Sequence, residues 1–333
     1  MNLGLLGGLN QDTDKKIDRL LRPKTLDEYI GQEPLKNKLR IAIECAKLEN
    51  REVPSIIISS RPGLGKSTIA EVIANEANVP IKTVFAPSLK SVSDIIEIVS
   101  KLQEKSILFL DEMHHLSPKI AECMYPCMDE FKFHIKLQNK QILPISTPRF
   151  CLMGATTSIG TIPAPMRDRF SIQHSLDFYT DDELAKIIEV NAKRLNVQVS
   201  DQGVYKYIAT KARGTPRYAN RILYRIYDYV TVKAKGALNI SSVKEALDIE
   251  GIDESGLTSI DRKYLFTMFK VFSCGPAGIR AISTSMNEDQ ESVMNFVEPF
   301  LLRCSFILLT PRGRALTAEG TQIALEILKN GQS

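Results

Sequence analysis

The chain has 333 residues, of which 44% are hydrophobic and 25% are charged, and its formal net charge is +4. This length allows two or three domains, and this composition is typical of a soluble globular protein. No run approaches the roughly 18 consecutive apolar residues that a membrane-spanning helix requires, so we predict no membrane span and a cytoplasmic location. The mild positive charge permits a nucleic-acid partner but does not by itself argue for one.

The first 20 residues hold a short apolar patch with glycines, between Leu3 and Leu9. The patch lacks a basic leading segment, and its apolar part is short and broken, so it differs from a secretory signal peptide. We therefore predict a flexible tail over residues 1–20.

Residues 21–178 alternate apolar runs with segments of helical periodicity, which predicts a parallel sheet with helices on both faces. Residues 131–150 differ, because apolar and polar residues alternate on either side of a polar turn at 138–141. This pattern predicts a β-hairpin that stands off the domain. The expected strands are residues 56–59, 81–85, 107–110 and 150–155, and the expected helices are residues 33–48, 66–77, 91–103 and 117–130.

A phosphate-binding loop is predicted directly after the first of these strands. Gly63 and Gly65 allow backbone N–H groups to turn toward phosphate oxygens. Lys66 can reach the β- and γ-phosphates, and the Ser67 hydroxyl can bind Mg²⁺. A helix that starts here adds its positive N-terminal dipole, so ATP with Mg²⁺ is the expected ligand. The loop residues assigned to the nucleotide are Pro62, Gly63, Leu64, Gly65, Lys66, Ser67 and Thr68.

The loop departs from the usual pattern, Gly-x-x-x-x-Gly-Lys-Ser/Thr, because Ser60 occupies its first position. We expect Ser60 to turn at some conformational cost and to lower nucleotide affinity. The alternatives are a degenerate loop that binds without turnover and an ordinary strand–turn–helix.

Two carboxylates follow the apolar run 107–110, where a buried parallel strand reaches the ligand-binding edge of its sheet. Asp111 is expected to hold Mg²⁺, and Glu112 to polarise the water that attacks the γ-phosphate. The strand at 150–155 ends in hydroxyls, and a polar side chain there can contact the γ-phosphate or that water. Arg169 follows, and an arginine at a subunit edge can stabilise charge on a neighbour's phosphate. The alternative for Arg169 taken alone is a surface ion-pair residue, and its position after the other motifs favours the first reading.

Six cysteines are scattered without any Cys-x-x-Cys pair. Cys123 and Cys127 are four residues apart, and His114, His115 and His134 are near them in sequence. This grouping allows a metal site, but we favour buried free thiols in a reducing cytoplasm.

The pattern becomes helical from Thr180, where Thr180 and Glu183 resemble a capping box. Between two later helices, Gly214 ends one and Pro216 opens the next, which places Arg217 at a helix N-terminus. A cation there is unfavourable unless a phosphate faces it. After this first helix, the expected helices are residues 204–212, 218–234 and 242–249, followed by a linker at 251–256.

The C-terminal part has the composition of a winged helix: three helical stretches near 259–272, 278–285 and 289–300, then a strand at 305–310 and a turn. Arg312 and Arg314 on that turn are placed to meet a DNA backbone or minor groove. Residues 253–333 hold eight Lys/Arg and nine Asp/Glu, a net charge of −1. A protein-docking module therefore stays an open alternative to DNA binding.

Taken together, these motifs resemble the RuvB family, the hexameric AAA+ motors that drive Holliday-junction branch migration in bacteria. The resemblance extends from about Leu21 to Gly320. It is carried by the segments Arg22–Gln32, Pro62–Lys66, Asp111–His114, Gly154–Thr157, Arg167–Phe170, Arg213–Arg217 and Thr310–Arg314.

The resemblance implies a role for each matching residue. Arg22, Tyr29 and Ile30 would contact the nucleotide, the last two against the adenine. Thr157 would be sensor 1, Arg169 the arginine finger acting on the neighbouring subunit, and Arg217 sensor 2. Lys66 and Ser67 would serve phosphate and Mg²⁺, Asp111 the metal, Glu112 the water, and Arg312 and Arg314 the DNA.

The implied fold is an α/β P-loop AAA+ ATPase core, a small all-α lid domain and a C-terminal winged helix. We assign residues 21–178, 179–252 and 253–333 to these three domains. The implied partners are duplex arms of four-way DNA, further copies of the chain in a homo-hexameric ring, and a RuvA-type junction-binding protein docked through the hairpin.

Several positions depart from the family pattern. Ser60 and Arg61 replace Gly and Pro, His115 and Ser158 each stand where the family has Arg, and Cys274 replaces the first Gly of a Gly-Gly-Pro. Leu309 replaces a basic residue before the wing, and the hairpin loop around 138–141 is shorter, which bears on RuvA docking. Two alternatives to a motor follow: an AAA+ loader or scaffold with a protein-binding C-terminal domain, and a nucleotide-binding member with weak turnover.

Overall fold

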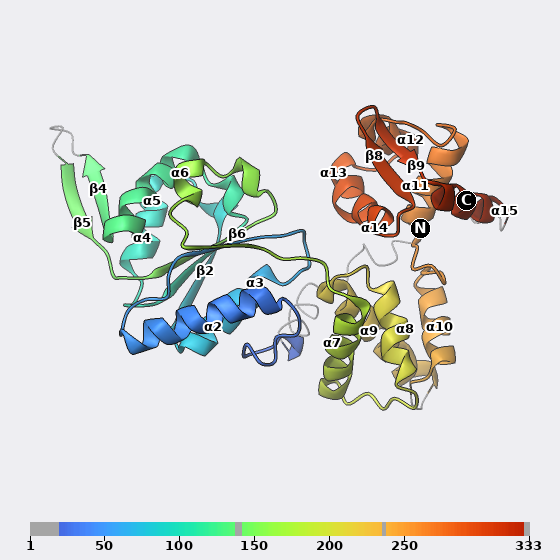
Figure 1. Ribbon diagram of the computed structural model, residues 1–333, viewed down its shortest axis with the longest axis horizontal. Coiled ribbons are helices and arrows are strands. Elements are labelled where there is room, and N and C mark those ends of the chain that lie inside the picture. Colours follow the sequence, from blue (N-terminus) through green and yellow to red (C-terminus); the bar gives the residue numbers. More distant parts are fainter. Residues whose placement is uncertain (1–19, 137–141, 235–237, 330–333) are drawn as a thin grey trace. The chain divides into compact units, whose positions relative to one another are not determined.

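The computed structural model describes residues 20–136, 142–234 and 238–329, so residues 1–19 of the predicted tail and the hairpin turn lie outside the described part. The described chain divides into two compact units, one ending at Tyr179 and the other beginning at Thr180 (Figure 1). Each unit is built around its own buried apolar core.

A five-stranded parallel sheet forms the centre of the first unit, in the order β2-β3-β6-β1-β7. The inner strands consist almost entirely of buried apolar residues, which fits strands covered on both faces. The strands are β1 (Ile56–Ser59), β2 (Ile81–Phe85), β3 (Ile107–Asp111), β6 (Cys151–Thr156) and β7 (Ile172–Ser175). The first four confirm the sequence prediction. The edge strand β7 was not predicted, because its alternating exposed residues give a weak signal.

Helices cover both faces of this sheet (Figure 1). Leu108 and Leu110 of β3 share a buried cluster with Ile95 of α4 and Ile120 of α5. The helices α2 and α3 lie on the opposite face, and α3 contacts β3 and β6. The bounds are α2 (Glu33–Leu48), α3 (Lys66–Ala77), α4 (Val92–Ser100), α5 (Pro118–Glu130) and α6 (Ala164–Arg167). The predicted α/β core is therefore confirmed, with α4 ending three residues early.

A two-stranded hairpin projects from the end of α5 (Figure 1). Its strands are β4 (Lys132–Lys136) and β5 (Ile142–Ser146), paired antiparallel. Phe133 is fully buried and anchors the base, whereas Ile142 and Leu143 are exposed. The hairpin predicted within residues 131–150 is present, and its turn at 137–141 lies outside the described residues.

The second unit begins with a bundle of helices. The capping box predicted at its start is present, because the Thr180 hydroxyl accepts from the Glu183 amide at 3.2 Å and the Thr180 amide donates to the Glu183 carboxylate at 2.8 Å. The helices are α7 (Asp181–Arg194), α8 (Gly203–Lys211), α9 (Pro216–Tyr229) and α10 (Ile240–Ile249), with a π-helical turn, η4 (Val230–Ala234), after α9.

The same unit continues into a winged helix, as predicted. Its apolar core includes Tyr264, Leu301 and Ile307. The helices are α11 (Ser259–Lys270), α12 (Ile279–Met286), α13 (Gln290–Ser292) and α14 (Glu298–Arg303), with the π-turn η5 (Val293–Val297) between the last two. The wing pairs β8 (Ile307–Thr310) with β9 (Gly313–Leu316). The short return segment expected after the turn is present as β9, whereas the final helix, α15 (Ala318–Lys329), was not predicted.

Within the described residues, none of the helices combines the length and the apolar character needed to cross a bilayer.

The glycine at the start of α15 allows a very close backbone contact. A Cβ atom at Gly320 would lie 1.9 Å from the Phe306 carbonyl oxygen, a distance that no relaxed structure tolerates. We expect Gly320→Ala to lower the free energy of unfolding by about 2 kcal/mol, because α15 must move off the wing to avoid the clash. Urea unfolding followed by circular dichroism measures the change.

The matched control is Gly160→Ala, an exposed position where nothing lies within 4 Å of the added Cβ. Its unfolding curve should overlay that of the wild type to within about 0.5 kcal/mol. Equal curves for Gly320→Ala and the wild type would contradict the close packing of α15.

Candidate functional site

The loop after β1 has the backbone conformation of a phosphate-binding loop. Gly63 and Gly65 have φ angles of +83° and +101°, in the region that favours glycine, and Gly65 is the N-cap of α3. A Cβ atom at Gly65 would lie 2.9 Å from the Tyr29 hydroxyl, so the position also lacks room for a side chain. The amides of the first turn of α3 point out of the helix N-terminus, where an anion is favoured.

The Lys66 ammonium is held within this loop. It donates to the Ser60 carbonyl at 3.0 Å and lies 3.4 Å from the Ser60 hydroxyl, which itself donates to the Arg61 carbonyl at 2.9 Å. The expected conformational cost of Ser60 is a wrong prediction, because Ser60 is not among the residues with positive φ. The first loop position therefore does not require glycine in this chain.

The strand order brings three strand ends together. The strand β6 lies between β1 and β3, with Ser59 opposite Thr156 and Leu110 opposite Gly154. Lys66 follows β1, Thr157 follows β6, and Asp111 ends β3, so all three belong to the carboxyl edge of the sheet. This is the edge where open α/β sheets bind ligands.

The Glu112 carboxylate has two polar neighbours. The Thr157 hydroxyl donates to its Oε2 at 3.4 Å, and His114 Nδ1 lies 3.3 Å from the same oxygen. His114 Nδ1 is also 3.1 Å from the Thr156 hydroxyl. Burial, followed by the charge of His115, lowers the pKa of His114, so its ring is neutral at neutral pH. Glu112 itself has φ +50°, a sparsely populated conformation for a residue with a side chain.

The sequence allowed a metal site among Cys123, Cys127 and the nearby histidines, but free thiols were the favoured prediction. The part of the chain that the structure describes contains no group of three His, Cys, Asp or Glu side chains placed to hold a metal ion. All six cysteines are free, and burial raises the pKa of the Cys127 thiol to about 12. The contact of His114 with Glu112 was not anticipated from the sequence.

The segment expected to contact the adenine packs against the loop. Tyr29 is buried, and its hydroxyl accepts a hydrogen bond from the Tyr179 hydroxyl at 3.1 Å. Burial raises the pKa of Tyr29 to about 12, so it stays protonated. Arg22 forms an ion pair with Glu71 of α3, and Ile30 is half-buried. Tyr179 was missed by the sequence analysis, because a lone tyrosine before a helix carries no motif.

Arg169 is fixed by residues of its own chain. Its Nε donates to Asp129 at 2.9 Å, another guanidinium nitrogen donates to the Pro165 carbonyl at 2.6 Å, and the group lies 4.5 Å from the centre of the Tyr125 ring. Both Tyr125 and Asp129 belong to α5. The arginine is thus presented in one conformation near the base of the hairpin.

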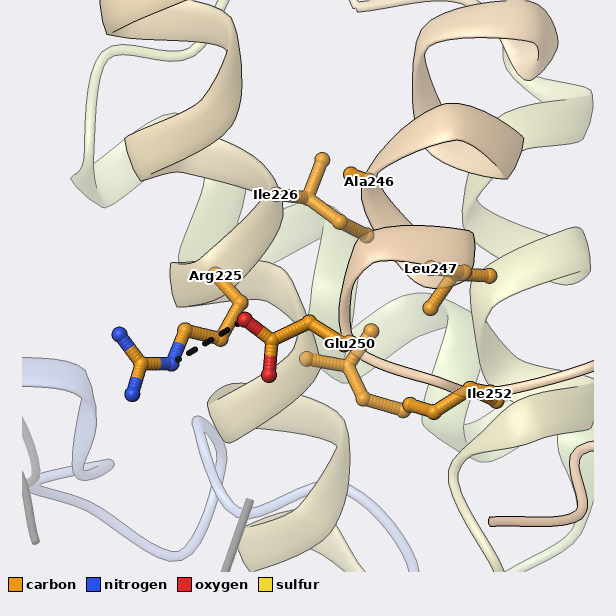
Figure 2. A pocket seen from close by; sticks show the side chains of 7 residues that line it. Arg225, Ile226, Ala246, Leu247, Glu250 and Ile252 are labelled. Atoms are coloured by element: carbon orange, nitrogen blue, oxygen red, sulfur yellow. Dashed lines mark ion pairs between the residues drawn. The ribbon is translucent and has the colours of Figure 1, made fainter. Parts of the chain in front are cut away.

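Arg217 is the second residue of α9 and is exposed, as the sequence predicted for a helix N-terminus. It belongs to the second compact unit, so its role toward a nucleotide stays a prediction. The same unit contains a pocket between α9 and α10, lined mainly by apolar side chains and closed on one side by the Arg225–Glu250 ion pair (Figure 2).

The two wing arginines differ in their surroundings. Arg312 is exposed at the turn between β8 and β9. Arg314 forms a two-pronged ion pair with Glu298 of α14, at 2.8 and 3.1 Å, and Tyr264 donates to the same carboxylate at 3.0 Å. Arg314 therefore attaches the wing to the helices, a function that the sequence analysis did not foresee. Its contact with DNA stays a prediction.

Comparison with known proteins identifies the family. Residues 21–176 match the Holliday junction DNA helicase RuvB P-loop domain, residues 179–253 the RuvB AAA lid domain, and residues 254–324 the RuvB C-terminal winged helix domain. The chain belongs to the RuvB family. It is accordingly a P-loop ATPase of the AAA+ class, with the resemblance inferred from the motifs confirmed.

Individual relatives agree over nearly the full chain. The Holliday junction branch migration complex subunit RuvB of Fusobacterium nucleatum is 38% identical over 321 residues, which are 96% of each chain. The solved Thermotoga maritima RuvB Holliday junction branch migration motor matches with a TM-score of 0.82 and 35% identity, covering 93% of this chain and 98% of that one. A mutant of Thermotoga maritima RuvB gives a TM-score of 0.83 at 35% identity and the same coverage.

Proposed function

We propose that this protein is an ATP-driven motor that moves DNA during branch migration of Holliday junctions, in recombination and DNA repair. The observation that carries the proposal is the convergence of Lys66, Asp111, Glu112 and Thr157 at one sheet edge, in a RuvB-family chain that also holds a lid and a winged helix. We assign residues 21–178, 179–252 and 253–333 to the three domains, and we place the activity in the cytoplasm.

The loop and strand ends fit MgATP. When nucleotide binds, its phosphate oxygens would accept hydrogen bonds from the amides around Gly63 and Gly65. Phosphate oxygens would also replace the loop carbonyls as the acceptors of the Lys66 ammonium. Ser67 and Asp111 supply the oxygen ligands that Mg²⁺ prefers. When bound, the ion neutralises charge that develops on the phosphates. Arg22, Tyr29, Ile30 and the loop residues Pro62, Leu64 and Thr68 complete the proposed nucleotide site.

Glu112 is the proposed base. Its carboxylate can accept a proton from the attacking water, and the Thr157 hydroxyl at 3.4 Å orients it. His114, whose pKa is lowered by burial, places a neutral ring beside this carboxylate.

Glu112→Gln keeps the size of this side chain and removes its basicity. We expect steady-state ATP turnover to fall by about 100-fold or more, with ATP still bound. ATP turnover is measured with and without a synthetic four-way DNA junction and a RuvA-type protein, and nucleotide binding is measured separately. Glu122→Gln, an exposed carboxylate on α5, is the matched control and should hydrolyse ATP like the wild type. Undiminished turnover in Glu112→Gln would remove the assigned base.

We further propose that the catalytic site is shared between neighbouring subunits of a hexameric ring. Asp129, Pro165 and Tyr125 hold the Arg169 guanidinium in place on its own chain. A guanidinium held in this way can stabilise phosphate charge on an adjacent subunit without further ordering. Arg217 would contact the nucleotide of its own chain as sensor 2.

Mixing two inactive variants tests this sharing. Lys66→Ala and Arg169→Ala should each be inactive, whereas a mixture forms some interfaces in which one chain supplies Lys66 and its neighbour supplies Arg169. In an equal mixture that assembles randomly with independent sites, about a quarter of the interfaces are complete. ATP turnover should therefore recover to about a quarter of the wild-type rate. Mixtures of each variant with itself are the control. A mixture that assembles but shows no turnover would refute a shared site.

The proposed DNA contacts lie on the wing. Arg312 is exposed and free to meet a phosphate, and Arg314 is the second proposed contact. Replacing Arg314 would also leave the Glu298 carboxylate, which is only 5% exposed, without its ion-pair partner. Weaker DNA binding by an Arg314 variant could then result either from a lost DNA contact or from a disturbed wing. The exposed Ile142 and Leu143 of the hairpin offer an apolar surface for a RuvA-type protein.

Arg312→Ala therefore gives the clean test of DNA binding. We expect weaker binding to duplex arms of any sequence, with the salt dependence of the binding constant reduced by about one unit of slope, because one phosphate contact is lost. Fluorescence anisotropy over a range of salt concentrations measures both. Lys329→Ala removes one exposed charge of the same domain and is the control. An unchanged slope would favour the alternative of a loader or scaffold whose C-terminal domain binds protein.

A further inference from the structure

Arg213 connects the lid to the winged helix inside the second compact unit. It follows α8 in the lid, with φ +54°, and its guanidinium pairs with the Asp261 carboxylate of α11. One nitrogen also donates to the Thr258 hydroxyl at 3.2 Å, and another to the Phe296 carbonyl at 3.4 Å. The lid residue thus has four polar contacts on the winged helix.

Aromatic rings enclose the same guanidinium. It lies 4.9 Å from the centre of the Tyr218 ring, which belongs to the lid, and 4.5 Å from that of Phe300, which belongs to α14. The side chain of Arg213 is 11% exposed and that of Asp261 is fully buried. A planar guanidinium that is stacked and paired by two nitrogens has a fixed orientation, which a lysine could not reproduce.

The segment between the two domains is also attached on both sides. The Asp253 carboxylate accepts from the amides of Ser255 and Leu257 at 2.9 Å each, and it pairs with Arg262 of α11 at 3.1 Å. Lys211 of the lid donates to the Glu254 carbonyl. The linker predicted at 251–256 is therefore bound to its neighbours rather than a free tether.

We propose that Arg213 and Asp261 join the lid and the winged helix into one rigid body, so that a movement of the lid with nucleotide state carries the DNA-binding wing. Arg213 is a positioning residue that touches neither nucleotide nor DNA. It lies four residues before Arg217, in the turn that joins α8 to α9, so the segment Arg213–Arg217 joins the proposed nucleotide sensor to the winged helix. The consequence for DNA movement rests on the proposed function.

Energetics favour a mechanical role over a stabilising one. A buried ion pair contributes little net stability, because desolvation of both charges offsets their attraction. What the pair adds is a single relative orientation of lid and winged helix, which is what transmission of a movement requires.

The test uses the double variant Arg213→Met/Asp261→Asn in the full-length protein. Both charges are removed together, so no buried charge is stranded, and the asparagine oxygen can still accept from Thr258, as Asp261 does in its capping box. The matched control is Arg225→Met/Glu250→Gln, which removes an ion pair that lies wholly within the lid (Figure 2).

Hydrogen exchange and motor coupling are then compared in the three proteins. In the Arg213/Asp261 variant we expect the amides of residues 254–258 to exchange about tenfold faster. The distance of branch migration per ATP hydrolysed should fall at least about fivefold. ATP turnover measured without DNA should stay unchanged. The control should match the wild type in all three. A merely structural pair would change exchange but not the distance moved per ATP.

The outcomes separate the two proposals. Unchanged linker exchange, or faster exchange with full coupling, would overturn the role of Arg213. A wild-type protein that hydrolyses ATP but moves no junction would instead refute the proposed function, a result seen without any variant.

Discussion

The placement of β6 between β1 and β3 is the constraint on which the rest of the site depends. Parallel strands end at a common edge, so this order brings the loop after β1 and the carboxylates after β3 to either side of Thr156 and Thr157. The apolar strands fix the positions of these ends, because each is buried against helices on both faces. The polar groups at this edge occupy positions set by packing rather than by one another.

Three arginines serve the protein's own structure. Arg314 attaches the wing to α14, Arg213 attaches the lid to α11, and Arg169 is held by α5. In each case a carboxylate of the same chain orients the guanidinium. For Arg169 this orientation is compatible with the proposed contact to a neighbouring subunit, whereas for Arg314 it occupies the nitrogens that the sequence suggested for DNA. A guanidinium–carboxylate pair thus has different consequences, which depend on how exposed the arginine is and on which element carries the carboxylate.

The accuracy of the sequence prediction followed the strength of each local signal. The phosphate loop, the buried strand before Asp111 and the capping box at Thr180 are local patterns, and the structure contains all three elements. The edge strand β7 and the helix α15 were missed, because half-exposed segments carry weak periodicity. The expected strain at Ser60 was wrong, because the φ angle at that position is decided by the pairing of the neighbouring strands.

Periodicity and short spacings are enough to predict the fold class and the nucleotide-site motifs from the sequence, and those motifs together resemble the RuvB family. The contacts of His114 and Thr157 with Glu112, the contact of Tyr179 with Tyr29, and the internal ion pairs of Arg314 and Arg213 are visible only in the folded chain. Such contacts join residues far apart in sequence, or depend on how a loop turns. They become defined only when packing of the apolar core fixes where each backbone segment lies.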